Sequence, residues 1–122
     1  MNKQRTINVL KETINQNKEG FTLKYTTLKP YNKNKGYSVS ITNIKSKYPL
    51  RNIKKVLNCI NGFKQIEKNL FIGGWLENGF YYLDLSLIIK DKHKSLILAN
   101  TFKQLAIFNF NNFKCINIKQ NG

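Results

Sequence analysis

The dipeptide Asn78-Gly79 constrains the fold more than any other feature of this chain. It stands between two segments rich in aromatic and branched side chains, 70–75 and 80–88. Asn-Gly is strongly favoured in the two-residue type I′ turn, whose twist matches that of antiparallel strands. The sequence therefore predicts a tight β-hairpin in the middle of the chain.

Similar local signals predict the remaining elements. A second hairpin is expected from 105–110 and 113–118 around Asn111-Asn112, since asparagine tolerates positive φ. Helices are expected at 6–17 with Thr6 as N-cap, from Pro49 to a stop at Gly62, and after Asp91 as cap. Their inward stripes are expected to be Ile7, Leu10 and Ile14, then Leu50, Ile53, Leu57 and Ile60, then Leu96, Ile97 and Phe102.

The order of these elements favours an α+β fold. Strands are also expected at 21–25 and 37–41, where apolar and polar residues alternate. From Tyr37 onward the order is then strand, helix, strand, strand, helix, strand, the ferredoxin-like βαββαβ order. We expect a single domain, 1–122, with three helices and an antiparallel sheet of five to six strands. An N-terminal helix and strand precede the core and a C-terminal hairpin ends it, leaving one sheet face open to a ligand.

Size and composition place the chain among globular proteins. Its 122 residues, 41% of them hydrophobic, suffice for one domain with a core. No apolar run approaches the roughly 20 residues that span a bilayer, and the polar start shows no secretory signal. Cys59 and Cys115 stand among isoleucines, so buried, reduced thiols and a cytoplasmic location are expected.

Charge is distributed very unevenly along the chain. Of a net charge of +15, ten lysines and arginines lie between Gly20 and Ile66, where no aspartate or glutamate occurs. Like charges that are not neutralised repel one another in the folded state. A protein tolerates this repulsion where the charges bind an anionic partner. An alternative is that an AT-rich genome enriches lysine codons, although this does not account for the missing acids.

The basic residues that we expect to bind nucleic acid are on the second helix and in the loop before the second strand. Helical spacing puts Lys47, Arg51, Lys54 and Lys55 on one side, and Lys33 and Lys35 add reach. Because lysine predominates, binding to DNA or RNA backbone with little sequence specificity is predicted. The alternative interpretation of the helix is a solvated charged face.

Aromatic residues of the central hairpin add a weaker prediction. Trp75, or Tyr82, could stack on a base, although aromatics at alternating strand positions are more often part of a core. The adjacent pair Gly73-Gly74 is typical of a β-bulge, and it could also allow close approach of a phosphate.

An enzyme is not expected. His93 is the only histidine, in a Lys-His-Lys setting with no metal-binding partner at suitable spacing. Asp84 shares a strand face with Tyr82 and Ser86, and Glu77 is too far along the strand to join it in a magnesium site. We therefore predict no catalytic residue, no metal and no cofactor.

Four short motifs carry a resemblance: Gly73-Gly74-Trp75, Tyr82 to Ser86 (Tyr-Leu-Asp-Leu-Ser), Asp91 before a helix, and Gln104 to Phe108 (Gln-Leu-Ala-Ile-Phe). Together with the strand from Gly36 to Ser40, they resemble, in this order, a family of small uncharacterised proteins of bacteriophages and other mobile elements. The resemblance covers roughly residues 36 to 118. It implies an accessory protein of a mobile element and supplies no activity.

Two alternatives to nucleic-acid binding remain open. The resemblance suggests a protein-binding inhibitor of a host defence nuclease, of the anti-restriction or anti-CRISPR type. A ribosomal or ribonucleoprotein component fits the charge, but not the scarcity of arginine. An open edge at the last hairpin could also pair two copies into a homodimer.

Overall fold

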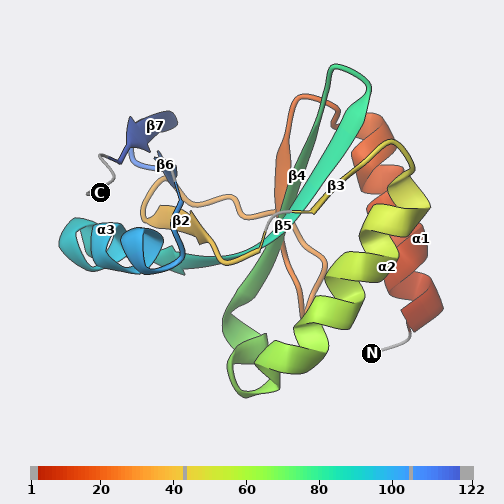
Figure 1. The fold of residues 1–122 in the computed structure, drawn as a ribbon, viewed down its shortest axis with the longest axis horizontal. Coiled ribbons are helices and arrows are strands. Elements are labelled where there is room, and N and C mark those ends of the chain that lie inside the picture. Colours follow the sequence, from red (N-terminus) through yellow and green to blue (C-terminus); the bar gives the residue numbers. More distant parts are fainter. Residues whose placement is uncertain (1–2, 43, 105, 119–122) are drawn as a thin grey trace.

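The computed structural model describes residues 3–42, 44–104 and 106–118. They form one antiparallel sheet covered by three helices, so the predicted α+β class is confirmed (Figure 1). The helices are α1 (Lys3–Gln16), α2 (Pro49–Ile60) and α3 (Lys92–Thr101), with a 3-10 segment η1 (Asn61–Asn69) after α2. The strands are β1 (Phe21–Lys24), β2 (Tyr37–Ser40), β3 (Ile44–Ser46), β4 (Leu70–Glu77), β5 (Phe80–Ile89), β6 (Ala106–Asn109) and β7 (Lys114–Asn117).

The sheet has seven strands where five to six were expected. Their order is β1-β4-β5-β2-β6-β7, and the additional strand β3 pairs with β5 beyond the end of β2. In β2, Ser40 lies opposite Ser86, and in β3, Ile44 lies opposite Leu83. The register with β5 therefore shifts by one residue between the two strands. Together β2 and β3 therefore act as one interrupted strand along β5.

The central strands have the split βαβ arrangement of a ferredoxin-like core. The connection through α2 joins β3 to β4 with β5 lying between, and α3 joins β5 to β6 with β2 lying between. Helix α1 and strand β1 precede this core, and β7 extends it. The predicted element order therefore matches the structure apart from β3.

Two groups of buried side chains hold the helices on one face of the sheet. The larger joins α1 and α2 to the sheet through residues such as Leu10, Ile53, Ile72 and Leu85. The smaller consists of Val39, Ala99 and Ile107 beneath α3. The twisted sheet carries them toward opposite ends of the molecule, as Figure 1 shows.

The inward stripes of the helices differ in part from expectation. Thr6 is a buried residue within α1, not its N-cap, because the helix already begins at Lys3. In α2 the buried residues are Asn52, Ile53, Val56 and Ile60, Leu57 is half-buried, and Leu50 is exposed. Backbone of helical φ and ψ continues through Asn61, so the chain enters η1 and Gly62 does not end the helix in open coil.

The third helix is capped as predicted, but its inward face is different. The Asp91 carboxylate accepts a hydrogen bond of 2.9 Å from the Lys94 amide. Ser95 and Ala99 are buried, while Ile97 and Phe102 are exposed. Leu96, as predicted, packs half-buried against the smaller cluster, together with Leu98.

The first hairpin is confirmed and the second differs in its turn. Asn78 and Gly79 both have positive φ, and Glu77 pairs directly with Phe80 across them. In the second, Asn109 pairs with Lys114, leaving a four-residue loop whose positive φ belongs to Phe113. Its asparagines instead accept hydrogen bonds from backbone amides: Asn109 from Asn111, and Asn112 from Lys114.

None of the helices in the described part of the chain is both long enough and apolar enough to cross a membrane.

Candidate functional site

The sheet face opposite the helices is polar at its centre. Strand alternation directs Leu83 and Leu85 toward the helices, so Tyr82, Asp84 and Ser86 point to the other side. Ser40 lies opposite Ser86 in the neighbouring strand and shares this side. The open face therefore carries a carboxylate among hydroxyl groups.

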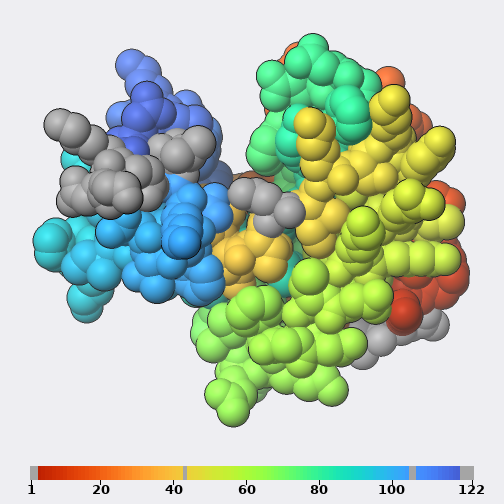
Figure 2. All heavy atoms as spheres, viewed as in Figure 1, coloured from red at the N-terminus to blue at the C-terminus, as the bar shows by residue number. Residues whose placement is uncertain are grey.

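Asp84, Ser86 and Ser40 belong to the floor of a hollow of about 870 Å³. The floor contains Ser38, Ser40, Gly73, Asp84 and Ser86. Aromatic side chains line it at several points: Phe21, Tyr31, Trp75, Phe108, Phe110 and Phe113. In Figure 2 the surface is indented between the C-terminal strands, in blue, and the β4–β5 hairpin, in green.

Asp84 is the buried acidic group of this floor. Its side chain is 7% exposed and accepts a hydrogen bond from the Ser40 hydroxyl. Burial raises the pKa of the carboxyl to about 6, and the hydrogen bonds from Ser40 and the Gly73 backbone oppose that rise. The predicted position beside Tyr82 and Ser86 is confirmed, and its partner is a hydroxyl group.

The paired glycines follow from close packing and not from a β-bulge. The β4–β5 register is continuous through Gly73, opposite Asp84, and Gly74, opposite Leu83. A Cβ on Gly73 would lie 2.8 Å from the Asp84 Oδ1 atom. On Gly74 it would lie 2.7 Å from the Tyr82 carbonyl oxygen. Glycine thus makes room for the carboxylate on one face and for β5 on the other.

The aromatic wall beside the β2 end of the hollow is held by ring contacts. The rings of Tyr31 and Phe110 pack edge to face, with their centroids 4.7 Å apart. The rings of Phe108 and Phe110 pack in the same way, with their centroids 4.9 Å apart. The Tyr31 hydroxyl donates to the Lys35 carbonyl oxygen at 2.6 Å. Loop residues 32–36 therefore adjoin this wall.

Basic and aromatic side chains alternate on the other side of the hollow. The ring of Trp75 stacks on Tyr82, with centroids 5.0 Å apart and planes 4° from parallel. The Lys45 Nζ atom lies 5.5 Å from the Tyr82 ring and 4.3 Å from that of Phe80, and the Lys47 Nζ atom lies 5.4 Å from Phe80. The guanidinium of Arg51 lies 5.6 Å from the ring of Tyr48. We call these residues the aromatic–basic band: Trp75, Tyr82, Lys45, Phe80, Lys47, Tyr48 and Arg51.

The band brings together part of the predicted site and adds to it. Lys54 and Lys55 continue from Arg51 along the exposed side of α2. Lys45, Tyr48 and Phe80 were not predicted. The alternation of Lys45 and Lys47 around buried Ser46 was a usable signal, because it puts both lysines on one side of a short strand.

Lys33 and Lys35 do not join the α2 residues. They precede β2, whereas Lys47 follows β3, and the intervening chain runs along β5. At ~3.3 Å per residue the two groups lie on the order of 30 Å apart. The hollow lies between them, because its wall touches the loop at Tyr31 and the band at Trp75.

The remaining candidate groups are a histidine and two cysteines. His93 is exposed in the first turn of α3. Cys59 is half-buried, and Cys115 is exposed on β7, contrary to the expected burial, because it lines the open hollow. Within the described residues, no group of three or more His, Cys, Asp or Glu side chains is placed to hold a metal ion.

Comparison with protein families, with curated proteins and with solved structures finds no match for this chain. Three of the four short motifs that stood out in the sequence contribute to this hollow, whereas Asp91 caps α3 instead. Gly73-Gly74-Trp75, the pair Asp84 and Ser86, and Gln104 with Phe108 all line the hollow, and so do Ser38 and Ser40 of β2. The hollow and the adjoining band are therefore the candidate functional surface.

Proposed function

We propose that this protein binds nucleic acid through its phosphate backbone, with little sequence specificity, and that the aromatic–basic band with Lys54 and Lys55 is the contact surface. The proposed activity is binding alone, with no catalytic step and no cofactor. One observation carries it: exposed cations alternate with aromatic rings along a continuous path.

The cations of this surface are available to an external anion. Lys45, Lys47 and Arg51 are exposed, and none forms an ion pair with any described residue. Lysine contacts release counterions from a nucleic acid, and this release supplies most of the affinity in nonspecific binding. One acid adjoins the band at its Trp75 end, where the Trp75 indole nitrogen donates a 3.4 Å hydrogen bond to a Glu77 carboxylate oxygen. The cations Lys45, Lys47 and Arg51 all belong to the stretch of sequence without acids.

The aromatic rings favour a single strand over a duplex. Tyr48 is 63% exposed and Trp75 is 36% exposed, so both offer ring area to a base. Unpaired bases stack on such rings with little regard to sequence, whereas bases within a duplex are already stacked.

Fluorescence anisotropy with labelled single- and double-stranded DNA and RNA, at about 50 to 300 mM salt, tests this proposal. We expect a Kd of about 1–100 μM near physiological salt for single strands, as is usual for nonspecific binding. The site variant replaces four cations by glutamine: Lys47, Arg51, Lys54 and Lys55. Loss of four phosphate contacts lowers the slope of log K against log salt by up to about 3 for single strands.

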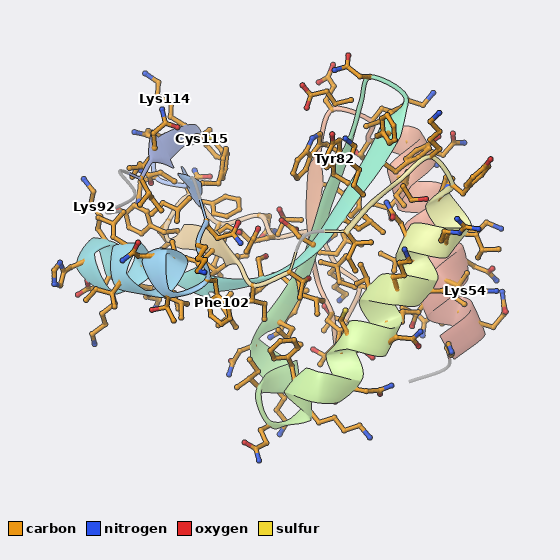
Figure 3. All side chains as sticks on the ribbon, in the orientation of Figure 1. Lys54, Tyr82, Lys92, Phe102, Lys114 and Cys115 are labelled. Carbon is orange, nitrogen blue, oxygen red and sulfur yellow. The ribbon has the colours of Figure 1, made fainter. Side chains whose placement is uncertain are left out.

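A matched control removes the same charge elsewhere, by glutamine substitution of Lys90, Lys92, Lys94 and Lys114. Lys92 and Lys114 lie at the other end of the molecule from Lys54 (Figure 3). We expect this variant to retain most of the slope. If both variants lose the slope equally, net charge alone attracts the strand and the assigned surface is wrong. If the wild type binds none of these nucleic acids, a protein partner is favoured instead.

A further inference from the structure

We propose that the hollow on the open sheet face binds one unpaired nucleobase that carries an amino group, with guanine preferred, from a single strand or a free nucleotide. The proposal rests on the proposed function, since the same strand would be held by the aromatic–basic band. It adds base selection to a contact that is otherwise unspecific.

The walls of the hollow suit a flat ligand. Aromatic side chains line it from opposite sides, with Phe108 and Phe110 on one side and Trp75 on the other. A volume of about 870 Å³ is within the range of small-molecule sites. Rings of this kind stack on the π-face of any base, so the walls favour a base without selecting which one.

The floor supplies the selection. An ionised carboxylate only accepts hydrogen bonds, and each oxygen has two lone pairs. Ser40 and the Gly73 backbone donate to Asp84, which leaves acceptor capacity at the hollow that Asp84 lines. Guanine presents two adjacent donors, N1–H and the N2 amino group, to such an acceptor. Thymine and uracil present one N–H flanked by two carbonyl oxygens, which a carboxylate repels.

The position of the hollow fits a base attached to a phosphate. Lys103 contributes to its lining, and loop residues 32–36, with Lys33 and Lys35, adjoin its aromatic wall. Trp75 belongs both to the hollow and to the band. A strand on the band could therefore turn one base past Trp75 onto the floor while its backbone stays near lysines.

The test uses labelled 11-nucleotide oligothymidines whose central position is guanine, cytosine, adenine or thymine. The wild type should bind the guanine strand about five-fold or more tightly than the all-thymine strand, as expected for bidentate base recognition. In Asp84→Asn the preference should fall to about two-fold or less, because an amide offers a donor and an acceptor and also suits thymine. The salt slope of Asp84→Asn should be unchanged. The site variant with four glutamines should instead show a smaller salt slope and keep the base preference.

A second measurement uses free nucleotides and the fluorescence of Trp75, the only tryptophan. Guanosine monophosphate should change this fluorescence at lower concentration than thymidine monophosphate, and Asp84→Asn should remove the difference. Equal binding of all four strands, or an unchanged preference in Asp84→Asn, would overturn the base site and leave the phosphate contact standing. Selective nucleotide binding with no strand binding would retain the hollow and reject the proposed function.

Discussion

Asp84 is the residue whose environment has the clearest consequence for stability. Burial raises its pKa to about 6 in the folded protein, above the ordinary value of 3.8. The folded state therefore binds the proton more tightly than the unfolded state, and stability falls as the pH rises from about 4 to about 6. Above that range the loss is constant and corresponds to about 3 kcal/mol.

We therefore expect Asp84→Asn to be more stable than the wild type at pH 7, by about 1–3 kcal/mol, and to lack the decline between pH 4 and 6. The uncharged amide is similar in shape and still accepts the Ser40 hydrogen bond. Urea denaturation at pH 4, 5, 6 and 7 measures this. Ser40→Ala is the opposite control, since losing its hydroxyl should cost more at pH 7 than at pH 4. An Asn variant less stable than the wild type at pH 7 would disprove the assigned burial cost.

At the residue scale, the sequence predicts which face of the sheet carries Asp84, but not why Gly73 and Ser40 lie beside it. Alternation along one strand predicts which side chains share a face. The space that Gly73 leaves for the Asp84 carboxylate depends on a register between two strands and on side-chain packing, so the sequence alone favours a β-bulge for the glycine pair. Likewise, nothing local indicated that Ser40 would donate to a carboxylate 44 positions away.

Helix α2 is tied to the sheet by a polar contact as well as by its apolar stripe. Asn52 is fully buried, and its Nδ2 atom donates to the Tyr81 carbonyl oxygen of β5. The Asn52 Oδ1 atom has no hydrogen-bond partner among the described residues. The amide therefore positions the helix that carries Arg51 and Lys54 relative to β5, which carries Phe80 and Tyr82 of the band.

We expect Asn52→Ala to lower the free energy of unfolding by about 1–3 kcal/mol, because it leaves a buried carbonyl without its donor. Asn52→Asp should cost more, since it turns a carboxylate toward that same carbonyl. Chemical denaturation of both variants gives the order. Asn58→Ala, at an exposed position of the same helix, serves as the control and should be nearly neutral. An Asp variant as stable as the Ala variant would contradict the assigned amide orientation.

Elements with local signals were predicted well and those held by distant pairing were not. The Asn78-Gly79 hairpin and the Asp91 cap depend on a few adjacent residues. Strand β3 is only three residues long and exists because Ile44–Ser46 pairs with β5, so the alternation of Lys45 and Lys47 around Ser46 is too short to predict a strand without that pairing. The four-residue loop of the last hairpin was missed because its asparagines act through their side chains.

At the scale of the whole molecule, the sheet decides which charges can act together. The acid-free stretch was a single feature of the sequence, but the β2–β3 strand separates its loop lysines from those of α2. Sequence spacing predicted that Arg51, Lys54 and Lys55 lie on the exposed side of one helix, because helical neighbours are local, whereas Lys47 precedes α2 and is outside the helix. Sequence spacing could not predict that a hollow lies between the two basic groups, since strand order is a property of the complete fold.

The two buried clusters make the two ends of the molecule unequal in stability. Among the described residues, twelve buried apolar side chains hold α1 and α2 to the sheet, whereas three lie beneath α3. Regions with fewer buried contacts open at lower free energy. The end formed by α3, β6 and β7 carries one wall of the hollow, so its opening would also release a bound base.

We therefore expect amides of α3 and β6 to exchange with deuterium about ten-fold or more faster than those of the central parts of β4 and β5. Ile107→Ala should accelerate exchange at α3 and β6 while leaving β4 and β5 close to the wild type, because Ile107 belongs only to the smaller cluster. Leu85→Ala, in the larger cluster, should lower protection in both regions. Native-state hydrogen exchange read by NMR resolves the two groups. Uniform protection, or an equal effect of both substitutions everywhere, would mean that the chain opens as one cooperative unit and that the wall of the hollow is as stable as its floor.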